Sequence, residues 1–422
     1  MPSANFSKRL SQALKTRVPK KYWNGTHRSV APDVTVRTLM PLTARFGITR
    51  VANVTGLDWL GVPVVMVCRP NSRSLSVSQG KGLTLDAAKA SGLMESIELY
   101  HAEHVVLPTK VGSVHEMSKR HNVVEVDQLQ NVNRLRYHEH RELLWAEGHD
   151  LLHDQSILVP YECVSNDVVR YNLPGQTCFG MTSNGLASGN NLLEAIVHAI
   201  CEVVERDAMT LWYSRKIQTR KSTFLDLNSC KDLNCEQLIA RFRESSLQVL
   251  VWDTSSDIGI PSFLCLLYEG TSDPSRLQYS SSGMGCHVSR SIALLRAITE
   301  SAQSRLTLIA GSRDDMFRDQ YEQLRFRSND LMQYQSLRPS NHEGKNLKAM
   351  PSFERDTFNK DLELILEKLQ SAGIKQVVVV ALTEADSPFQ VVKVIIPGLE
   401  GLDDHPMYSP GPRAQRFRQH LI

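Results

Sequence analysis

The stretch LLEAIVHAICEVVERDAMTLW, residues 192–212, is predicted to form one long helix with two different faces. One face is apolar, and the other is a polar stripe made of Glu194, His198, Glu202, Glu205 and Arg206. The stripe forms because residues three, four and seven positions apart lie on one side of a helix. Taken alone, it fits a solvent-exposed helix with charge pairs as well as it fits a metal site.

Two further segments repeat this pattern of carboxylates at helical spacing. A helix predicted over residues 85–104 carries Ser91, Glu95 and Glu98, and a helix predicted over residues 290–310 carries Arg296, Glu300 and Gln303. Alone, the first segment is equally ambiguous, and the second favours a surface ion pair. Together, five glutamates converging from three helices would repel one another unless cations neutralised them. Because Mg²⁺ prefers oxygen ligands and often brings phosphates with it, the three helices predict a metal-bridged nucleotide site.

The rest of the chain predicts an α+β fold, with mixed sheets covered by helices. Short runs rich in apolar and β-branched residues predict strands at 50–54, 62–69, 156–164, 247–253, 261–268, 376–381 and 390–396. A further helix is predicted over residues 361–372. Small-residue segments at 182–190 and 280–286 are predicted to be loops that lead into two of the acidic helices. The charged stretch 311–350 is predicted to be an exposed insertion or a mobile cover.

The amino-acid composition excludes few classes of function. The chain has 422 residues, 22% of them charged, and a net charge of +3, which is too small to predict general nucleic-acid binding. Its basic N-terminus is not followed by an apolar run, and no segment approaches the roughly 20 apolar residues of a membrane span. We therefore expect a cytoplasmic protein that binds neither membrane nor nucleic acid. The eight scattered cysteines are predicted to be reduced structural thiols.

Several ordered motifs together resemble the YcaO family. They are Gly80-Lys81-Gly82 followed by Ser91-x-x-x-Glu95-x-x-Glu98; Thr182-Ser183-Asn184-Gly185-Leu186-Ala187 followed by Glu202-Val203-Val204-Glu205-Arg206; and Arg296-Ala297-Ile298-Thr299-Glu300 with Gln303. The resemblance implies a YcaO-type fold unrelated to P-loop proteins, in which acidic helices form an ATP site. It divides the chain into a basic extension (1–24), a catalytic domain (25–400) and a C-terminal tail (401–422).

The resemblance also implies roles for individual residues, and ATP and Mg²⁺ as cofactors. The magnesium-binding carboxylates of the family match Glu95, Glu98, Glu202, Glu205 and Glu300. Its phosphate-contacting arginines match Arg206 and Arg296, which are the predicted catalytic residues. Further nucleotide contacts are implied for Ser91, Ser183 and Asn184, and a weaker N-terminal match implies them for Arg28 and Thr35.

Family members use ATP to activate a peptide amide oxygen so that a nucleophile replaces it. The segments 25–28, 46–51 and 69–73 resemble the subgroup that works with a separate TfuA protein, and the chain lacks the proline-rich tail common in ring-forming members. This favours thioamide formation on a ribosomally made peptide or protein, with a TfuA-like partner and sulfide or another sulfur donor. An azoline-forming cyclodehydratase is the runner-up. A non-catalytic ATP-binding scaffold, a small-molecule ligase or kinase, and a homodimer stay open.

Overall fold

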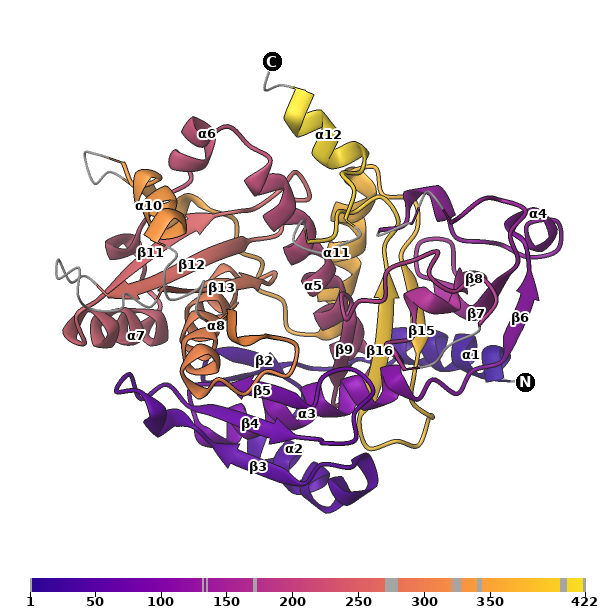
Figure 1. Cartoon of the computed structure of the whole chain (residues 1–422), viewed down its shortest axis with the longest axis horizontal. Helices are drawn as coiled ribbons and strands as arrows, with labels where there is room; N and C mark the ends of the chain where they lie inside the picture. The colour runs from indigo at the N-terminus through magenta and orange to yellow at the C-terminus, as the bar shows by residue number, and fades with distance from the viewer. Residues whose placement is uncertain are drawn as a thin grey trace.

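Three long helices meet near the middle of the molecule, and each follows closely after a strand (Figure 1). Strand β5 (Val77–Lys81) precedes α3 (Leu85–Glu103), β9 (Leu186–Gly189) precedes α5 (Leu192–Tyr213), and β13 (Ser280–Cys286) precedes α8 (Arg290–Ala310). The computed structural model describes residues 2–130, 133, 136–169, 173–269, 280–319, 321, 328–339, 344–402 and 408–419. The three predicted acidic helices are confirmed within one or two residues.

Each of the three acidic helices has one end that is capped by a side chain or by a glycine. The Thr84 hydroxyl accepts from the Ala87 N–H at the start of α3, and the Asn191 amide oxygen accepts from the Glu194 N–H at the start of α5. Helix α8 ends at Gly311, whose φ of 58° lies in the left-handed region that glycine adopts without strain. Local sequence therefore fixes where α3 and α5 begin and where α8 ends.

The strands form antiparallel sheets, apart from one short parallel pair. One three-stranded sheet has the order β3 (Arg50–Asn53), β4 (Val64–Cys68), β5, and another has the order β11 (Leu247–Asp253), β12 (Ser262–Glu269), β13. The largest sheet runs β6 (Thr109–Gly112), β7 (Leu143–Asp150), β15 (Val378–Ala381), β16 (Gln390–Ile395), β9, and β8 (Gln155–Pro160) also pairs with β7. In each of these three sheets, the strand that directly precedes an acidic helix therefore lies at the edge of the sheet.

Glycines let two of these strands lie directly on the helices that follow. A Cβ atom added at Gly80 would lie 2.1 Å from the Ala88 carbonyl oxygen, and one added at Gly285 would lie 2.1 Å from the Ala293 carbonyl oxygen. No side chain fits at such a distance, so the strand backbone packs against the helix backbone. Glu95 and Glu300 each lie 15 residues after their glycine. The chain therefore repeats a strand–helix unit in space, although no sequence repeat is apparent.

The core lies mainly behind α5 and between the sheets and their helices. The apolar face of α5 packs with β16 and with α11 (Phe358–Ser371), which brings Ile196, Ile200 and Val203 against Val392 and Val394. Three tryptophans, Trp145, Trp212 and Trp252, are fully buried elsewhere in the fold. This packing leaves the polar stripe of α5 facing away from its apolar neighbours.

Some sequence predictions differ from the structure. Residues 280–286 were predicted to be a loop but form β13, which pairs with β12 along its whole length; its small residues fit a strand pressed against a helix. The predicted loop 182–190 contains β9, and the predicted strand 156–164 ends at Pro160. Strand β7 and helix α7 (Leu233–Glu244) were not predicted. The predicted domain boundaries stay predictions.

The remaining elements lie at the periphery and at the termini. Helix α1 (Pro2–Lys15) buries Leu10 against the core around α5, and in the stretch 311–350 Leu331, Leu337 and Leu347 are buried. In the described parts of the chain, none of the helices is long and apolar enough to cross a membrane. The other elements are β1 (Lys21–Trp23), β2 (Thr26–Arg28), α2 (Pro32–Leu39), α4 (Val114–Met117), α6 (Ile217–Lys221), β10 (Leu225–Asp226), α10 (Ser328–Ser336), β14 (Lys345–Asn346) and α12 (Pro412–Gln419).

The close strand–helix contact can be tested with one added methyl group. Gly80→Ala should lower the free energy of unfolding by about 1–3 kcal/mol, because the new Cβ overpacks the backbone of α3. Gly56→Ala is the matched control, since its Cβ would have no atom within 4 Å. Chemical unfolding of the two variants measures the difference, and equal stabilities would contradict the packing described for β5 and α3.

Candidate active site

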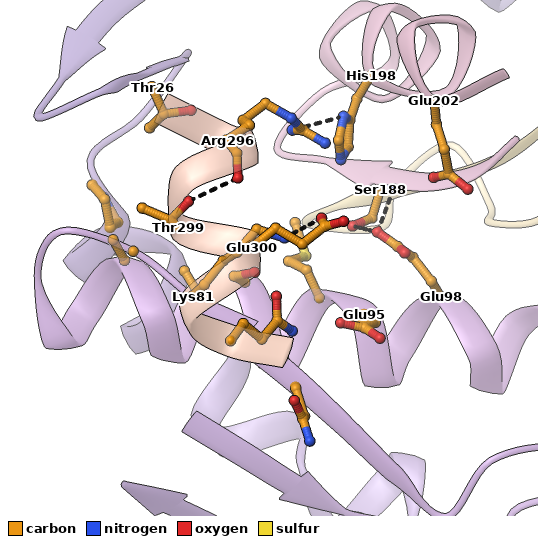
Figure 2. Close-up of a pocket in the computed structure, with 18 of the residues that line it drawn as sticks. Thr26, Lys81, Glu95, Glu98, Ser188, His198, Glu202, Arg296, Thr299 and Glu300 are labelled. Carbon is orange, nitrogen blue, oxygen red and sulfur yellow. Dashed lines mark hydrogen bonds and ion pairs between the residues drawn. The ribbon is translucent and has the colours of Figure 1, made fainter. Parts of the chain in front are cut away.

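The three acidic helices enclose a cavity of about 520 Å³ that also reaches β2 and α2. Figure 2 shows Glu95 and Glu98 projecting from α3, Glu202 from α5 and Glu300 from α8 into this one space. Glu205 of α5 lines the same cavity. All five predicted metal ligands therefore meet, although they come from three separate segments of the chain.

Burial disfavours the charged forms of four of these carboxylates, and repulsion from neighbouring carboxylates adds to the effect for Glu95, Glu98 and Glu205. Burial raises the pKa of Glu95 from 4.5 to about 7; the nearby Glu202 and Glu300 add to this increase, and Lys81 opposes it. Burial likewise raises the pKa of Glu98 to about 8, although its carboxylate accepts hydrogen bonds from the Ser188 N–H (2.8 Å) and hydroxyl (2.5 Å). Burial also raises the pKa values of Glu202 and Glu205. A ligand that brings positive charge would therefore favour the ionised forms of these carboxylates.

One glutamate already has a cation beside it. The Lys81 ammonium lies 2.8 Å from Glu300 Oε2, and the Met284 N–H donates to Glu300 Oε1 at 3.0 Å. Burial alone would raise the pKa of Glu300, but Lys81, together with Arg206 and the Met284 N–H, outweighs it and holds that pKa below its ordinary value. The motif Gly80-Lys81-Gly82 did not by itself predict this role for Lys81. Its place between two glycines, one of which packs on α3, was the clue to a position inside the site.

Arginines line the cavity together with the carboxylates. Arg28, Arg206 and Arg296 reach it from β2, α5 and α8. Arg28 Nε lies 3.7 Å from Glu194 Oε1, and Arg296 Nη1 lies 3.4 Å from His198 Nδ1. Phosphates have the charge and the acceptor oxygens that guanidinium groups bind, so the cavity carries donors for phosphate beside ligands for a metal.

The other predicted nucleotide contacts divide between two cavities. Ser91, Thr35 and Ser183 line the main cavity, and the Thr35 hydroxyl donates to Asn190 Oδ1 at 2.8 Å. Asn184 instead lines a smaller neighbouring cavity, where its side-chain amide donates to Gln130 Oε1 at 3.0 Å. The structure therefore brings together all the predicted site residues except Asn184. Their roles toward a ligand stay predictions.

The cavity suits a cation that is shared with a second ligand. Among the described residues, no three histidine, cysteine, aspartate or glutamate side chains stand close enough to enclose a metal ion by themselves. Glu205 Oε2 is buried and has no hydrogen-bond partner in the described part of the chain. Mg²⁺ commonly takes only one or two carboxylates and completes its coordination with phosphate oxygens and water. Spread carboxylates with an unpartnered oxygen fit that mode of binding.

Comparison with known proteins identifies the family. A family model described as YcaO cyclodehydratase, ATP- and Mg²⁺-binding, matches residues 79–400. The chain belongs to the YcaO family. The family description confirms ATP and Mg²⁺ as the predicted cofactors. The match spans all three acidic helices.

Relatives of this YcaO protein cover most of its length. An uncharacterized protein in the tfuA 3′ region of Rhizobium leguminosarum bv. trifolii is 38% identical over 379 residues, which make up 88% of each chain. An uncharacterized protein of Methanothermobacter thermautotrophicus is 31% identical over 384 residues, covering 88% of this chain and 95% of that protein.

Solved structures share the fold. YcaO from Methanopyrus kandleri, bound with AMPPCP and Mg²⁺, superposes with a TM-score of 0.70 at 21% identity, covering 93% of this chain and 100% of that one. A heterocyclase in complex with substrate and cofactor gives 0.77 at 24% identity and covers 92% of this chain. Because the match covers 54% of the heterocyclase, this chain spans about half its length. These likenesses confirm the predicted α+β YcaO-type fold.

The raised pKa values predict that Mg-ATP stabilises the protein more at high pH. A carboxyl whose pKa is raised on folding contributes stability below its ordinary pKa and loses that contribution as the pH rises through the raised value. The ligand-free protein should therefore lose stability as the pH rises through about 7 to 8, where Glu95 and Glu98 ionise. The increase in Tm caused by Mg-ATP should then be larger at pH 8 than at pH 6.

Two glutamate variants separate the site from the rest of the surface. Glu205→Gln should raise the Tm of the ligand-free protein at pH 8 and reduce the gain from Mg-ATP, because it removes one repelling carboxylate. Glu363→Gln, at an exposed position of α11, should change neither quantity. Thermal unfolding at the two pH values tests both statements, and a gain independent of pH in the unmodified protein would contradict them.

Proposed function

We propose that this YcaO protein uses ATP and Mg²⁺ to activate a backbone amide of a peptide or protein. The observation that carries the proposal is that all five predicted metal ligands line one cavity together with Arg28, Arg206 and Arg296. Such a site suits a reaction in which positioning and electrostatic stabilisation of a transferred phosphoryl group supply most of the catalysis. The family description, with its cyclodehydratase activity and its ATP and Mg²⁺ ligands, supports the same reaction class.

The residues of the cavity divide into two roles in this proposal. Glu95, Glu98, Glu202, Glu205 and Glu300 hold Mg²⁺, which neutralises the charge of the phosphates when it is bound. Arg206 and Arg296 contact the phosphates and stabilise the charge on the group in transfer, and Arg28, Thr35, Ser91 and Ser183 contact the nucleotide. Asn184 is left out of this set because it lines a different cavity.

The chemistry follows from the inertness of an amide. The amide oxygen attacks the γ-phosphorus of ATP, the bond to ADP breaks, and the oxygen becomes part of a phosphate leaving group. A nucleophile then adds to the amide carbon, and phosphate departs with the original oxygen. Sulfide as nucleophile leaves a thioamide. A neighbouring cysteine, serine or threonine side chain leaves an azoline ring.

We favour thioamide formation with a TfuA-like partner and a sulfur donor. The relative encoded in a tfuA 3′ region, at 38% identity over most of both chains, supports this choice. Azoline formation is the second candidate, because the matching family model is described as a cyclodehydratase. A non-catalytic scaffold is less well supported, since all five candidate metal ligands are retained and face one cavity.

The mass of the modified peptide decides between the two products. The protein is incubated with Mg-ATP, sulfide, a TfuA-like partner and the candidate peptide, and the mass of the peptide is then measured by mass spectrometry. We expect a gain of about 16 Da, from exchange of oxygen for sulfur; a loss of about 18 Da would assign cyclodehydration instead. Omitting ATP is the control. Unchanged mass with ATP consumed, for every peptide encoded beside the gene, would contradict backbone activation.

A further inference from the structure

The polar stripe of α5 holds arginines at two successive turns of the helix. Glu194, His198 and Glu202 are spaced four residues apart, so they lie one above another on the same face. Arg28 approaches Glu194 from β2, and Arg296 approaches His198 from α8. Figure 2 shows the second of these contacts, with the Arg296 guanidinium directed at the His198 ring. The two arginines thus meet α5 through side chains of different charge.

The charge of Arg28 is offset by Glu194. The two side chains are 3.7 Å apart at Nε and Oε1, and the side chain of Glu194 is 2% exposed. The Glu194 carboxylate is fixed by donors from Ser29, both N–H and hydroxyl, and from the Asn190 side-chain amide. A carboxylate held this firmly beside a guanidinium leaves little net charge for a ligand.

His198 meets Arg296 without offsetting its charge. A guanidinium has only donors and stays protonated in proteins, so His198 Nδ1 must be the acceptor across the 3.4 Å contact and the ring proton must sit on Nε2. Burial, together with the neighbouring Arg296 and Arg28, holds the pKa of His198 well below its ordinary value. Arg296 Nε is buried with no hydrogen-bond partner among the described residues. His198 therefore does not reduce the charge of Arg296, which also keeps an unused donor at Nε.

We propose that His198 is a positioning residue that orients Arg296 toward the nucleotide phosphates as a neutral acceptor. A carboxylate at this turn would hold the guanidinium equally well and would cancel the charge that phosphate recognition needs. The inference rests on the proposed function, because it assumes that Mg-ATP binds in this cavity. It assigns different tasks to the two arginines: Arg28 is anchored and largely neutralised, and Arg296 supplies charge to the phosphates.

Substitutions at His198 distinguish an uncharged acceptor from a mere space-filling side chain. His198→Asn keeps a neutral acceptor near the position of Nδ1, His198→Asp replaces it with a charged one of the same size, and His198→Leu removes it. We expect the Kd for Mg-AMPPCP and the kcat for phosphate release from Mg-ATP to stay within about threefold in His198→Asn. His198→Asp should weaken binding and slow turnover by about tenfold or more each, since it neutralises a group that stabilises phosphate charge. His198→Leu should lower kcat more than it raises Kd.

The control is His115→Asp, the same charge change at an exposed histidine of α4 that does not line the cavity. It should bind Mg-AMPPCP as the unmodified protein does. If thermal unfolding shows that both variants are folded, equal Kd values for His198→Asn and His198→Asp would overturn the proposal. If His198→Asp does not fold, normal binding and turnover in His198→Leu would overturn it as well. Failure of the proposed function looks different, because the unmodified protein would then not bind Mg-AMPPCP at all.

Discussion

Mutual repulsion among five carboxylates, held together by three helices, is the constraint on which the structure of the site depends. Lys81 lies beside Glu300, whereas burial raises the pKa values of the other four, and neighbouring carboxylates add to the increase for Glu95, Glu98 and Glu205. Buried carboxylates placed this close together are typical of a functional site in which a bound ligand supplies positive charge. Binding of cations with phosphates then removes the repulsion and fills the cavity in one step.

The fold brings the carboxylates together through backbone contacts that no side chain could enter. Gly80 and Gly285 let a strand lie directly on α3 and on α8, and Glu95 and Glu300 follow their glycines at the same separation. The apolar face of α5 is anchored by β16 and α11, which leaves its stripe free to face the other two helices. The three acidic helices are therefore held in place by close packing against neighbouring strands and helices.

The sequence predicted what local periodicity determines and missed what depends on partners distant in the chain. The acidic helices and their five glutamates were predictable, because each stripe is complete within one segment. Strand β13 was missed because its small residues are suited to a helix packed against it, which sequence periodicity does not reveal. The contacts of Lys81 with Glu300 and of His198 with Arg296 join residues 219 and 98 positions apart, so only the fold brings them together. Asn184 faces another cavity because Gln130 holds its side chain there.

The central claim is that α3, α5 and α8 together hold divalent cations against a nucleotide. Crystals of the protein grown with Mn²⁺ and AMPPCP test it most directly, since anomalous scattering locates Mn²⁺ independently of the protein density. Manganese takes the same oxygen ligands as magnesium. The account predicts anomalous peaks between the glutamates of the three helices, each touching phosphate oxygens. Nucleotide bound elsewhere, or bound in this cavity with no peak among the carboxylates, would contradict it.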